Sequence, residues 1–299
     1  MSGQARLREL GLIRDQVELG PLTTYKAGGP ARLFAEPRSM TDLNELIASG
    51  LTTESPILVL GRGSNLVVAD AGFDGLVVHL AGEFSGMTLT GDEVVAGGAA
   101  PLPRVARSAV EAGMLGVEFF VGVPGSVGGA VHQNAGCFGV ETADRLISAQ
   151  LLDLVTGERR EPGPGGLDLA YRHSNVAAGE VVVSARFRVR EGNAERGKGL
   201  MREITRWRKE HQPGGTLNAG SVFKNPPGTT AGELIDRLGL KGMRVGDVAV
   251  SEKHANFFVA GAGATASQIR ELVELVKDTV RELSGTILEP EIQFVGFER

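Results

Sequence analysis

Residues 116–139 read GVEFFVGVPGSVGGAVHQNAGCFG, a glycine-rich run within an otherwise apolar part of the chain. Two shorter runs share this character, and they cover residues 61–65 (GRGSN) and 261–266 (GAGATA). Glycine lets backbone N–H groups approach a phosphate closely and adopts positive φ, while serine and asparagine add neutral donors. The runs therefore predict either sites that hold a pyrophosphate or simple tight turns, and the residues alone leave both interpretations open.

The composition is that of an ordinary globular protein, except that the glycine content is unusually high. The chain has 299 residues, enough for two or three subdomains that share cores. Hydrophobic residues make up 42% and charged residues 22%. The 43 glycines make up a fraction of the chain about twice the usual ~7%, and they show no collagen-like period. A net charge of −5 gives no bulk attraction to nucleic acid or to an anionic membrane.

Several classes of protein are not expected. The single cysteine, Cys137, has no partner for an internal disulfide, and the five histidines lie too far apart in sequence to suggest a metal site. Residues 1–16 are charged and lack the apolar core of a signal peptide. No uncharged apolar run reaches the ~18 residues of a membrane span. We expect a cytoplasmic protein with no metal, no membrane insertion and no obligate protein partner.

Short apolar runs predict most of the secondary structure. β-Strands are expected over residues 57–60, 76–80, 87–90, 93–96, 150–155 and 181–190. Apolar residues at helical spacing predict a helix near 102–112 that buries Leu102, Val105, Ala106, Ala109 and Val110. Further helices are expected over residues 41–49, about 200–210, 230–238 and 266–283.

Local signals predict how these helices begin and end. We expect N-terminal caps at Thr41, at Thr230 in a capping box with Glu233, and near Thr265. The apolar stripe of the last helix extends to Leu283. The stretch Glu191–Gly199 is polar and contains glycine, so we place the main domain boundary near residue 195.

The third glycine run also matches the GxGxxA pattern of dinucleotide-binding domains. That pattern normally opens a domain of several βαβ units, whereas only about thirty residues follow it here. We therefore expect a plain connection between a strand and a helix.

Six segments follow one another in an order that is more specific than any one of them. They are TTYKAGGPARLFAEP (23–37), LGRGSNLVVADAGFDGLVV (60–78), the run at 116–139, YRHSN (171–175), NAGSVFKNP (218–226) and LEPEIQFVG (288–296). With these segments the chain resembles the UDP-N-acetylenolpyruvoylglucosamine reductase family of flavoenzymes over about residues 20–297. The short spacing between Arg172 and Ser221 matches the family's second type, which lacks an inserted tyrosine-bearing loop.

The resemblance implies an α+β fold. It implies an FAD-binding domain of the vanillyl-alcohol-oxidase (PCMH) type in two α+β subdomains, residues 1–80 and 81–195, followed by a C-terminal α+β substrate-binding domain, residues 196–299. It also implies FAD as the cofactor. The residues expected to hold FAD are Gly61, Arg62, Gly63, Ser64, Asn65, Leu66, Gly122, Gly125, Ser126, Val127, Gly128, Gly129, Asn134, Ala135 and Gly136.

The family's reaction implies the remaining site residues. NADPH, the co-substrate, gives a hydride to FAD N5, and the hydride then passes to the enolpyruvyl double bond of UDP-N-acetylglucosamine enolpyruvate. The product, UDP-N-acetylmuramate, is a peptidoglycan precursor. Ser221 matches the family's proton donor, Arg172 its cation, and Glu291 the glutamate that assists with the intermediate. Sugar and diphosphate contacts are implied for Tyr171, Arg208, Lys224 and Asn225.

The residue types suit these roles. Hydride addition to an enol ether conjugated with a carboxylate puts negative charge on that carboxylate, and the arginine fork binds a carboxylate at two points. Two alternatives stay open, another FAD oxidoreductase of the same fold and a non-catalytic protein that binds flavin or a nucleotide sugar. Loss of activity in Ser221→Ala with flavin retained separates the enzymes from the binding protein.

Overall fold

The computed structural model describes residues 3–298. The packing divides the chain into two compact units. The first contains Met1–Gln16, Arg32–Arg62 and Gly75–Trp207, and the second contains Val17–Ala31, Gly63–Asp74 and Arg208–Arg299. The second unit thus joins two N-terminal segments to the C-terminal third of the chain. The three consecutive subdomains implied by the family resemblance stay a prediction.

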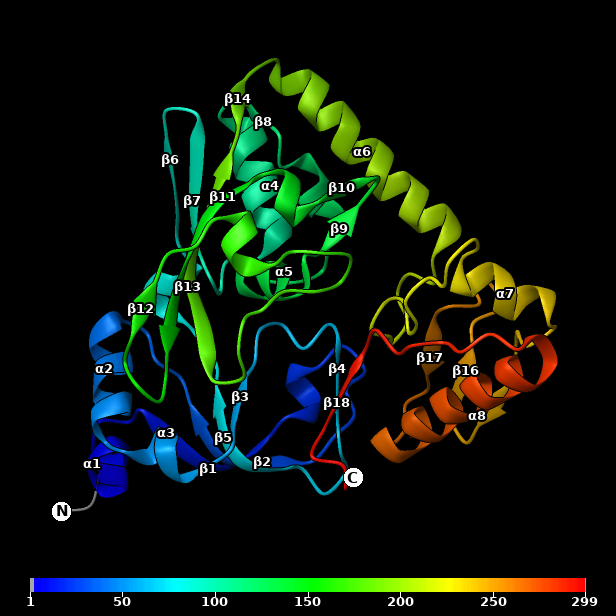
Figure 1. The fold of residues 1–299 in the computed structure, drawn as a ribbon, viewed down its shortest axis with the longest axis horizontal. Helices are drawn as coiled ribbons and strands as arrows, with labels where there is room; N and C mark the ends of the chain where they lie inside the picture. The colour runs from blue at the N-terminus through cyan, green and yellow to red at the C-terminus, as the bar shows by residue number, and fades with distance from the viewer. Residues whose placement is uncertain (1–2, 299) are drawn as a thin grey trace. The chain divides into compact units, whose positions relative to one another are not determined.

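The first unit begins with a four-stranded sheet in the order β1-β2-β5-β3. Its strands are β1 (Ile13–Glu18), β2 (Pro30–Ala35), β5 (Phe73–Val78) and β3 (Ile57–Val59). Three helices lie together beside it in Figure 1, α1 (Gly3–Glu9), α2 (Met40–Ala48) and α3 (Leu51–Glu54). The expected cap at Thr41 is wrong, because Ser39 caps α2 in a reciprocal capping box with Asp42.

A second sheet in this unit has five antiparallel strands in the order β12-β11-β13-β7-β6. They are β12 (Arg159–Arg160), β11 (Leu146–Asp153), β13 (Glu180–Arg188), β7 (Glu93–Gly97) and β6 (Met87–Thr90). Two helices lie beside it, α4 (Leu102–Glu111) and α5 (Val127–Gln133). The five apolar residues predicted to be buried in α4 are all buried, which confirms the helical pattern.

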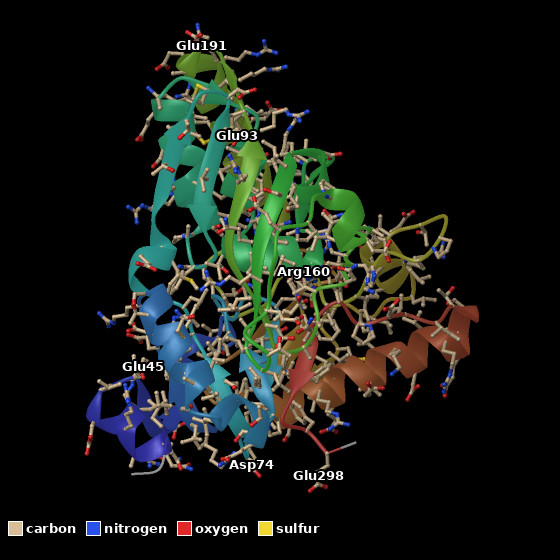
Figure 2. The ribbon with its side chains drawn as sticks, turned by 60° about the vertical axis from the view of Figure 1, so that its left-hand side comes forward. Glu45, Asp74, Glu93, Arg160, Glu191 and Glu298 are labelled. Carbon is tan, nitrogen blue, oxygen red and sulfur yellow. The ribbon has the colours of Figure 1, made fainter. Side chains whose placement is uncertain are left out.

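Ion pairs stiffen this five-stranded sheet. The Arg160 guanidinium donates to both carboxylate oxygens of Glu180, at 2.6 and 2.7 Å. Glu93, on the neighbouring strand β7, accepts from Arg186 at 3.0 Å. Figure 2 labels Glu93 and Arg160 on the sheet. Short elements complete the unit: β8 (Met114–Leu115), β14 (Arg190–Glu191), β9 (Gly136–Cys137), β10 (Val140–Glu141), η2 (Gly82–Ser85), η3 (Glu118–Gly122), η4 (Thr142–Asp144) and η5 (Pro164–Leu167).

The long helix α6 (Ala194–His211) begins earlier than the predicted residue 200. The side-chain oxygen of Asn193 accepts from the N–H groups of Glu195 and Arg196, so this asparagine starts the helix. Gly197, taken as part of a polar connection, is buried in α6 instead. A Cβ at Gly197 would lie 2.7 Å from a methyl carbon of Leu115, so the glycine permits close packing.

The second unit contains a three-stranded antiparallel sheet and a parallel pair of strands. The sheet consists of β15 (Arg244–Val245), β16 (Val248–Val250) and β17 (Phe258–Ala260), and the pair of β4 (Leu66–Val68) and β18 (Gln293–Val295). Figure 1 shows α7 (Ala231–Arg237) and α8 (Ala266–Ser284) beside β16 and β17. The turn η1 (Gly20–Leu22) also belongs to this unit.

The ends of α8 agree with the sequence prediction, with one exception. Thr265 caps the helix in a capping box with Gln268, and Gly285 follows its end with φ 74°. Leu283 is 61% exposed, so its inclusion in the buried stripe was wrong. The strand after α8 is β18, which pairs with β4 and not with β17. The GAGATA segment is therefore a plain strand-to-helix turn, as expected.

Neither a membrane-spanning helix nor a cluster of metal ligands is found in the described part of the chain. Between residues 3 and 298, no helix is long and apolar enough to cross a membrane. Within the same range, no group of three or more His, Cys, Asp or Glu side chains is arranged to hold a metal ion.

Candidate active site

The GRGSN loop, residues 61–65, connects β3 and Leu60 to β4. None of its five backbone N–H groups donates to an acceptor within residues 3–298. Gly63 is buried and has φ 58°, and a Cβ there would lie 2.5 Å from the carbonyl oxygen of Leu22. Backbone N–H groups inside a protein are rarely left without an acceptor. This row of amides therefore suits the phosphate oxygens of a bound dinucleotide.

Gly61, the first residue of the GRGSN run, lies against Ser126 of the second glycine run within the first unit. A Cβ at Gly61 would lie 2.7 Å from Oγ of Ser126, so only glycine permits this approach. Ser126 also caps α5 by accepting from the N–H of Gly129 at 3.4 Å. The N–H groups of Gly125 and Ser126 likewise have no acceptor within the described residues. Two of the expected FAD loops are thus neighbours.

Two glycines near these loops have structural explanations. A Cβ at Gly122 would lie 2.5 Å from Sγ of Cys137, so this glycine makes room for the cysteine. Gly98, which the sequence analysis missed, accepts from the N–H of Gly128 at 2.8 Å, and a Cβ on it would overlap the carbonyl oxygen of Val182. Its signal in the sequence is the glycine pair directly after the strand predicted at 93–96.

Asn134 links the NAG segment to the YRHSN segment. It lies in the left-handed region with φ 42°, which asparagine tolerates, and its side chain is buried. Nδ2 donates to Glu141 at 2.9 Å and to the carbonyl of Ala170 at 3.0 Å, and Oδ1 accepts from the N–H of Ala143 at 2.9 Å. The side chain thus orders the backbone directly before Tyr171 and Arg172.

Arg172 has the strained conformation found at many functional positions. Its φ is 55°, uncommon for a residue with a long side chain. The guanidinium lies 4.9 Å from the ring centre of Tyr171, and Nη1 is 3.8 Å from a carboxylate oxygen of Glu141. Glu141 was missed by the sequence analysis, and only the fold brings this carboxylate near Arg172.

Ser221 and Glu291 lie on adjoining segments of the second unit. The N–H of Glu291 donates to the carbonyl of Val222 at 2.7 Å. One residue further, Phe223 forms an antiparallel bridge with Pro290, while Ser221 forms one with Phe257. The Ser221 and Glu291 segments are thus hydrogen-bonded neighbours although they lie far apart in the sequence, and the expected proton donor and glutamate are one residue out of register.

The expected diphosphate contacts also have partners in the protein. Lys224 donates to the carboxylate of Glu289 at 2.6 Å. The side-chain oxygen of Asn225 accepts from the N–H of Ala231 at 3.1 Å, at the start of α7. Arg208 donates to Oε1 of Gln212 at 2.6 Å. An anion at Lys224 therefore competes with Glu289, which is largely exposed and can swing away.

The GRGSN loop also contacts the Glu291 segment. Nδ2 of Asn65 donates to the carbonyl of Glu291 at 2.9 Å, and the N–H of Gln293 donates to the carbonyl of Asn65 at 3.0 Å. The Thr24 N–H donates to the carbonyl of Gly63 at 3.1 Å. Gly63 and Asn65, both expected FAD contacts, belong to the second unit and are held there by other backbone groups of the same unit.

Tyr25 is hydrogen-bonded to the strand β17 and to the segment that leads into Ser221. Its hydroxyl donates to the carbonyl of Phe258 at 3.3 Å and accepts from the backbone N–H of Ala219, two residues before Ser221. Burial raises the pKa of Tyr25 well above its ordinary value, against the weaker opposite effect of the Ala219 hydrogen bond. Tyr25 is thus a neutral hydrogen-bonding group, whose role the TTYKAGGP motif did not reveal.

Comparison with known protein families identifies the class of this protein. A model of an FAD-binding domain matches residues 31–161. Glucose dehydrogenase Phl p 4.0202 is similar in structure, with a TM-score of 0.52 over 96% of this chain and 59% of its own, at 13% identity. Together with the unpaired amides of the GRGSN loop, the match defines an FAD-binding α+β protein, and it confirms the predicted fold class.

The rest of the chain identifies the particular family. The model of the C-terminal domain of UDP-N-acetylenolpyruvoylglucosamine reductase matches residues 212–295. The reductase of Paramagnetospirillum magneticum is 41% identical over 294 residues, 98% of this chain and 94% of that protein. The reductase of Rhodopseudomonas palustris is 42% identical over 96% of this chain and 92% of its own length.

A solved structure gives the same result. The crystal structure of UDP-N-acetylenolpyruvylglucosamine reductase (MurB) from Thermus caldophilus matches with a TM-score of 0.83 and 38% identity, over 95% of this chain and 99% of that one. The chain belongs to the UDP-N-acetylenolpyruvoylglucosamine reductase family. It is accordingly an FAD-dependent oxidoreductase.

Proposed function

We propose that this protein reduces the enolpyruvyl double bond of UDP-N-acetylglucosamine enolpyruvate to form UDP-N-acetylmuramate, with NADPH as the electron donor. The reaction adds one hydride from NADPH and one proton across the double bond and releases NADP⁺. The proposal rests above all on the adjoining Ser221 and Glu291 segments, joined by the Glu291 N–H to Val222 hydrogen bond of 2.7 Å. In the family these segments provide the proton donor and its partner.

FAD, when bound, carries the hydride between NADPH and the substrate. Within the first unit, the amides of Gly61, Arg62, Gly125 and Ser126 are available to hold its pyrophosphate, since they lack protein acceptors. Backbone amides are neutral donors, so they can hold an anionic pyrophosphate in a protein whose net charge is −5.

Arg172 stabilises the charge that develops on the substrate. Hydride addition to one carbon of the double bond leaves negative charge on the other carbon and on its carboxylate. A preorganised cation there is typically worth ~10²–10³ in rate. Tyr171 and Glu141 hold the guanidinium beforehand, so little reorganisation is needed during the reaction.

Ser221 then gives its hydroxyl proton to the carbon next to the carboxylate. A serine hydroxyl is a weak acid, so this transfer requires a strongly basic carbon such as that of an enolate. Glu291 assists beside it, and the proton of the serine is restored from solvent. Lys224, Asn225, Arg208 and Tyr171 bind the diphosphate and sugar, and the diphosphate displaces Glu289 from Lys224.

Anaerobic half-reactions of the FAD-loaded protein test the proposal. NADPH bleaches the flavin absorbance, and UDP-N-acetylglucosamine enolpyruvate then restores it. In Ser221→Ala we expect bleaching to proceed nearly unchanged and reoxidation to slow by ~10²–10⁴-fold, the usual contribution of a general acid.

Other outcomes point elsewhere. If bleaching and reoxidation fall equally in Ser221→Ala, Ser221 is not the proton donor. A wild-type protein that bleaches but is not reoxidised by this substrate is a different flavin enzyme, and one that binds flavin without being reduced by NADPH fits the binding-protein alternative.

A further inference from the structure

Asn256 is a polar residue in the interior of the second unit. It is only 3% exposed, and its partners Val222 and Phe223 belong to the hydrophobic core there. Burying an amide without hydrogen-bond partners costs free energy, so such a residue is kept where its bonds serve a purpose.

The Asn256 side chain pairs with the backbone of one residue. The N–H of Phe223 donates to Oδ1 at 2.9 Å, and Nδ2 donates to the carbonyl of Phe223 at 2.8 Å. The backbone carbonyl of Asn256 accepts from the N–H of Val222 at 2.8 Å. The side-chain amide therefore takes the place that a peptide group of a neighbouring strand would occupy.

No backbone group from the same loop is available for this task. The chain folds on itself after Ser251, whose N–H donates to the carbonyl of Phe257 at 2.8 Å, while the N–H of Phe257 donates to His254 at 2.9 Å. The loop therefore cannot continue as a strand beside Phe223. Among neutral side chains, only those of asparagine and glutamine combine a donor and an acceptor at the spacing of a peptide group.

These hydrogen bonds lie next to Ser221. Ser221 bridges Phe257, the residue after Asn256, and precedes the two residues that Asn256 holds. On its other side is Gly220, which has φ 77° and whose N–H donates to Oδ1 of Asn218 at 3.0 Å. Ser221 thus lies between a glycine in the left-handed region and a backbone segment that is hydrogen-bonded to the Asn256 side chain.

We infer that Asn256 is the positioning residue for the Ser221 hydroxyl, an inference that rests on the proposed function of Ser221 as proton donor. Asn256 acts through the peptide groups of Val222 and Phe223. Proton transfer depends steeply on geometry, and a displacement of about 1 Å can cost ~10²-fold in rate. Loosening this segment should therefore slow protonation specifically.

The test uses the FAD-loaded full chain and Asn256→Asp, which keeps the shape and the acceptor for the Phe223 N–H. The second carboxyl oxygen faces the Phe223 carbonyl and has no proton to donate when the group is ionised, so the half-reactions are followed as the pH is raised through its ionisation. We expect flavin reoxidation by UDP-N-acetylglucosamine enolpyruvate to slow by ~10–100-fold, whereas reduction by NADPH changes by less than about twofold. We also expect a larger solvent deuterium isotope effect on reoxidation, because proton transfer becomes slower. Asn256→Gln, which restores the donor on a longer side chain, should recover part of the rate.

Val280→Ala is the matched control for lost stability. Val280 is fully buried in α8 of the same unit and forms no part of the serine segment. We expect it to lower the melting temperature while both half-reactions keep their wild-type ratio.

Each outcome decides the inference. It is overturned if Asn256→Asp lowers the melting temperature as Val280→Ala does but leaves reoxidation and its isotope effect unchanged. It is equally overturned if both half-reactions fall together. If the wild-type protein itself is not reoxidised by the substrate, the proposed function fails first and the inference fails with it. The wild-type experiment therefore separates the two failures.

Discussion

Two glycine runs of similar composition follow β-strands in this molecule, and they behave differently. In the GRGSN loop, Gly63 is buried and all five amides lack a protein acceptor within the described residues. In the GAGA turn, residues 261–264, the first three residues are exposed, and the N–H of Gly261 donates to the carbonyl of Asp247 at 2.7 Å. An exposed turn has its amides in water and needs no ligand, whereas the GRGSN loop has one buried and three half-buried residues whose amides lack a protein acceptor.

Alanine at each run should give the largest difference. In Gly63→Ala, the positive φ and the contact with Leu22 oppose the new methyl group, and we expect about 2–4 kcal/mol of lost stability together with loss of bound FAD. In Gly263→Ala, the nearest atom is the flexible carboxylate end of Asp247, so we expect at most about 0.5 kcal/mol.

Chemical denaturation and flavin absorbance after gel filtration measure both effects. Equal flavin content and equal stability of the two variants would break the comparison, because the GRGSN loop would then be an ordinary turn.

The next largest effect is expected at Tyr25, which follows the residue whose N–H donates to Gly63 of the GRGSN loop. Tyr25→Phe removes only a hydroxyl and leaves the carbonyl of Phe258 and the N–H of Ala219 without this partner. We expect a loss of about 1–2 kcal/mol, measured by denaturation, because buried polar groups lose their hydrogen bonds. An unchanged free energy of unfolding would show that water replaces the hydroxyl.

The smallest effect concerns Asp70, which joins the segment after the GRGSN loop to the helix after the GAGA turn. Its carboxylate accepts from the N–H groups of Ala266 and Ser267 at 2.8 and 2.9 Å and from the Ser267 hydroxyl at 2.6 Å. We expect Asp70→Ala to cost about 1 kcal/mol at neutral pH, comparable to the loss of a helix cap.

The pH dependence of this contribution has a definite sign. Burial alone raises the pKa of the Asp70 carboxyl, but the hydrogen bonds from Ser267 and Ala266 outweigh it, so the pKa lies below the ordinary 3.8. A lowered folded-state pKa means that the stabilisation is present above pH 3.8 and disappears as the pH falls through the folded-state value. Denaturation curves of wild type and Asp70→Ala should therefore converge in acid, and a constant difference would contradict this role.

Local patterns predicted the helices well where one face packs against a core. The i, i+3, i+4 spacing in α4 identified all five of its buried residues, and Thr265 and Gly285 marked both ends of α8. The prediction failed at the start of α6, because Gly197 resembles a linker residue in sequence but is a close-packing position against Leu115. This contact is made with a residue 82 positions earlier in the chain, and a local sequence pattern holds no information about it.

The family, the α+β class and the segments that carry the expected site were predictable from the amino-acid sequence, because the order of these segments along the chain is specific. The fold was needed to show which glycine run has a buried glycine and a row of amides without a protein acceptor. It also decided that Asn256, Tyr25 and Glu141 support the residues chosen from the motifs. The physical reason is that hydrogen-bond satisfaction is settled between segments far apart in the chain, and the fold alone brings those segments together.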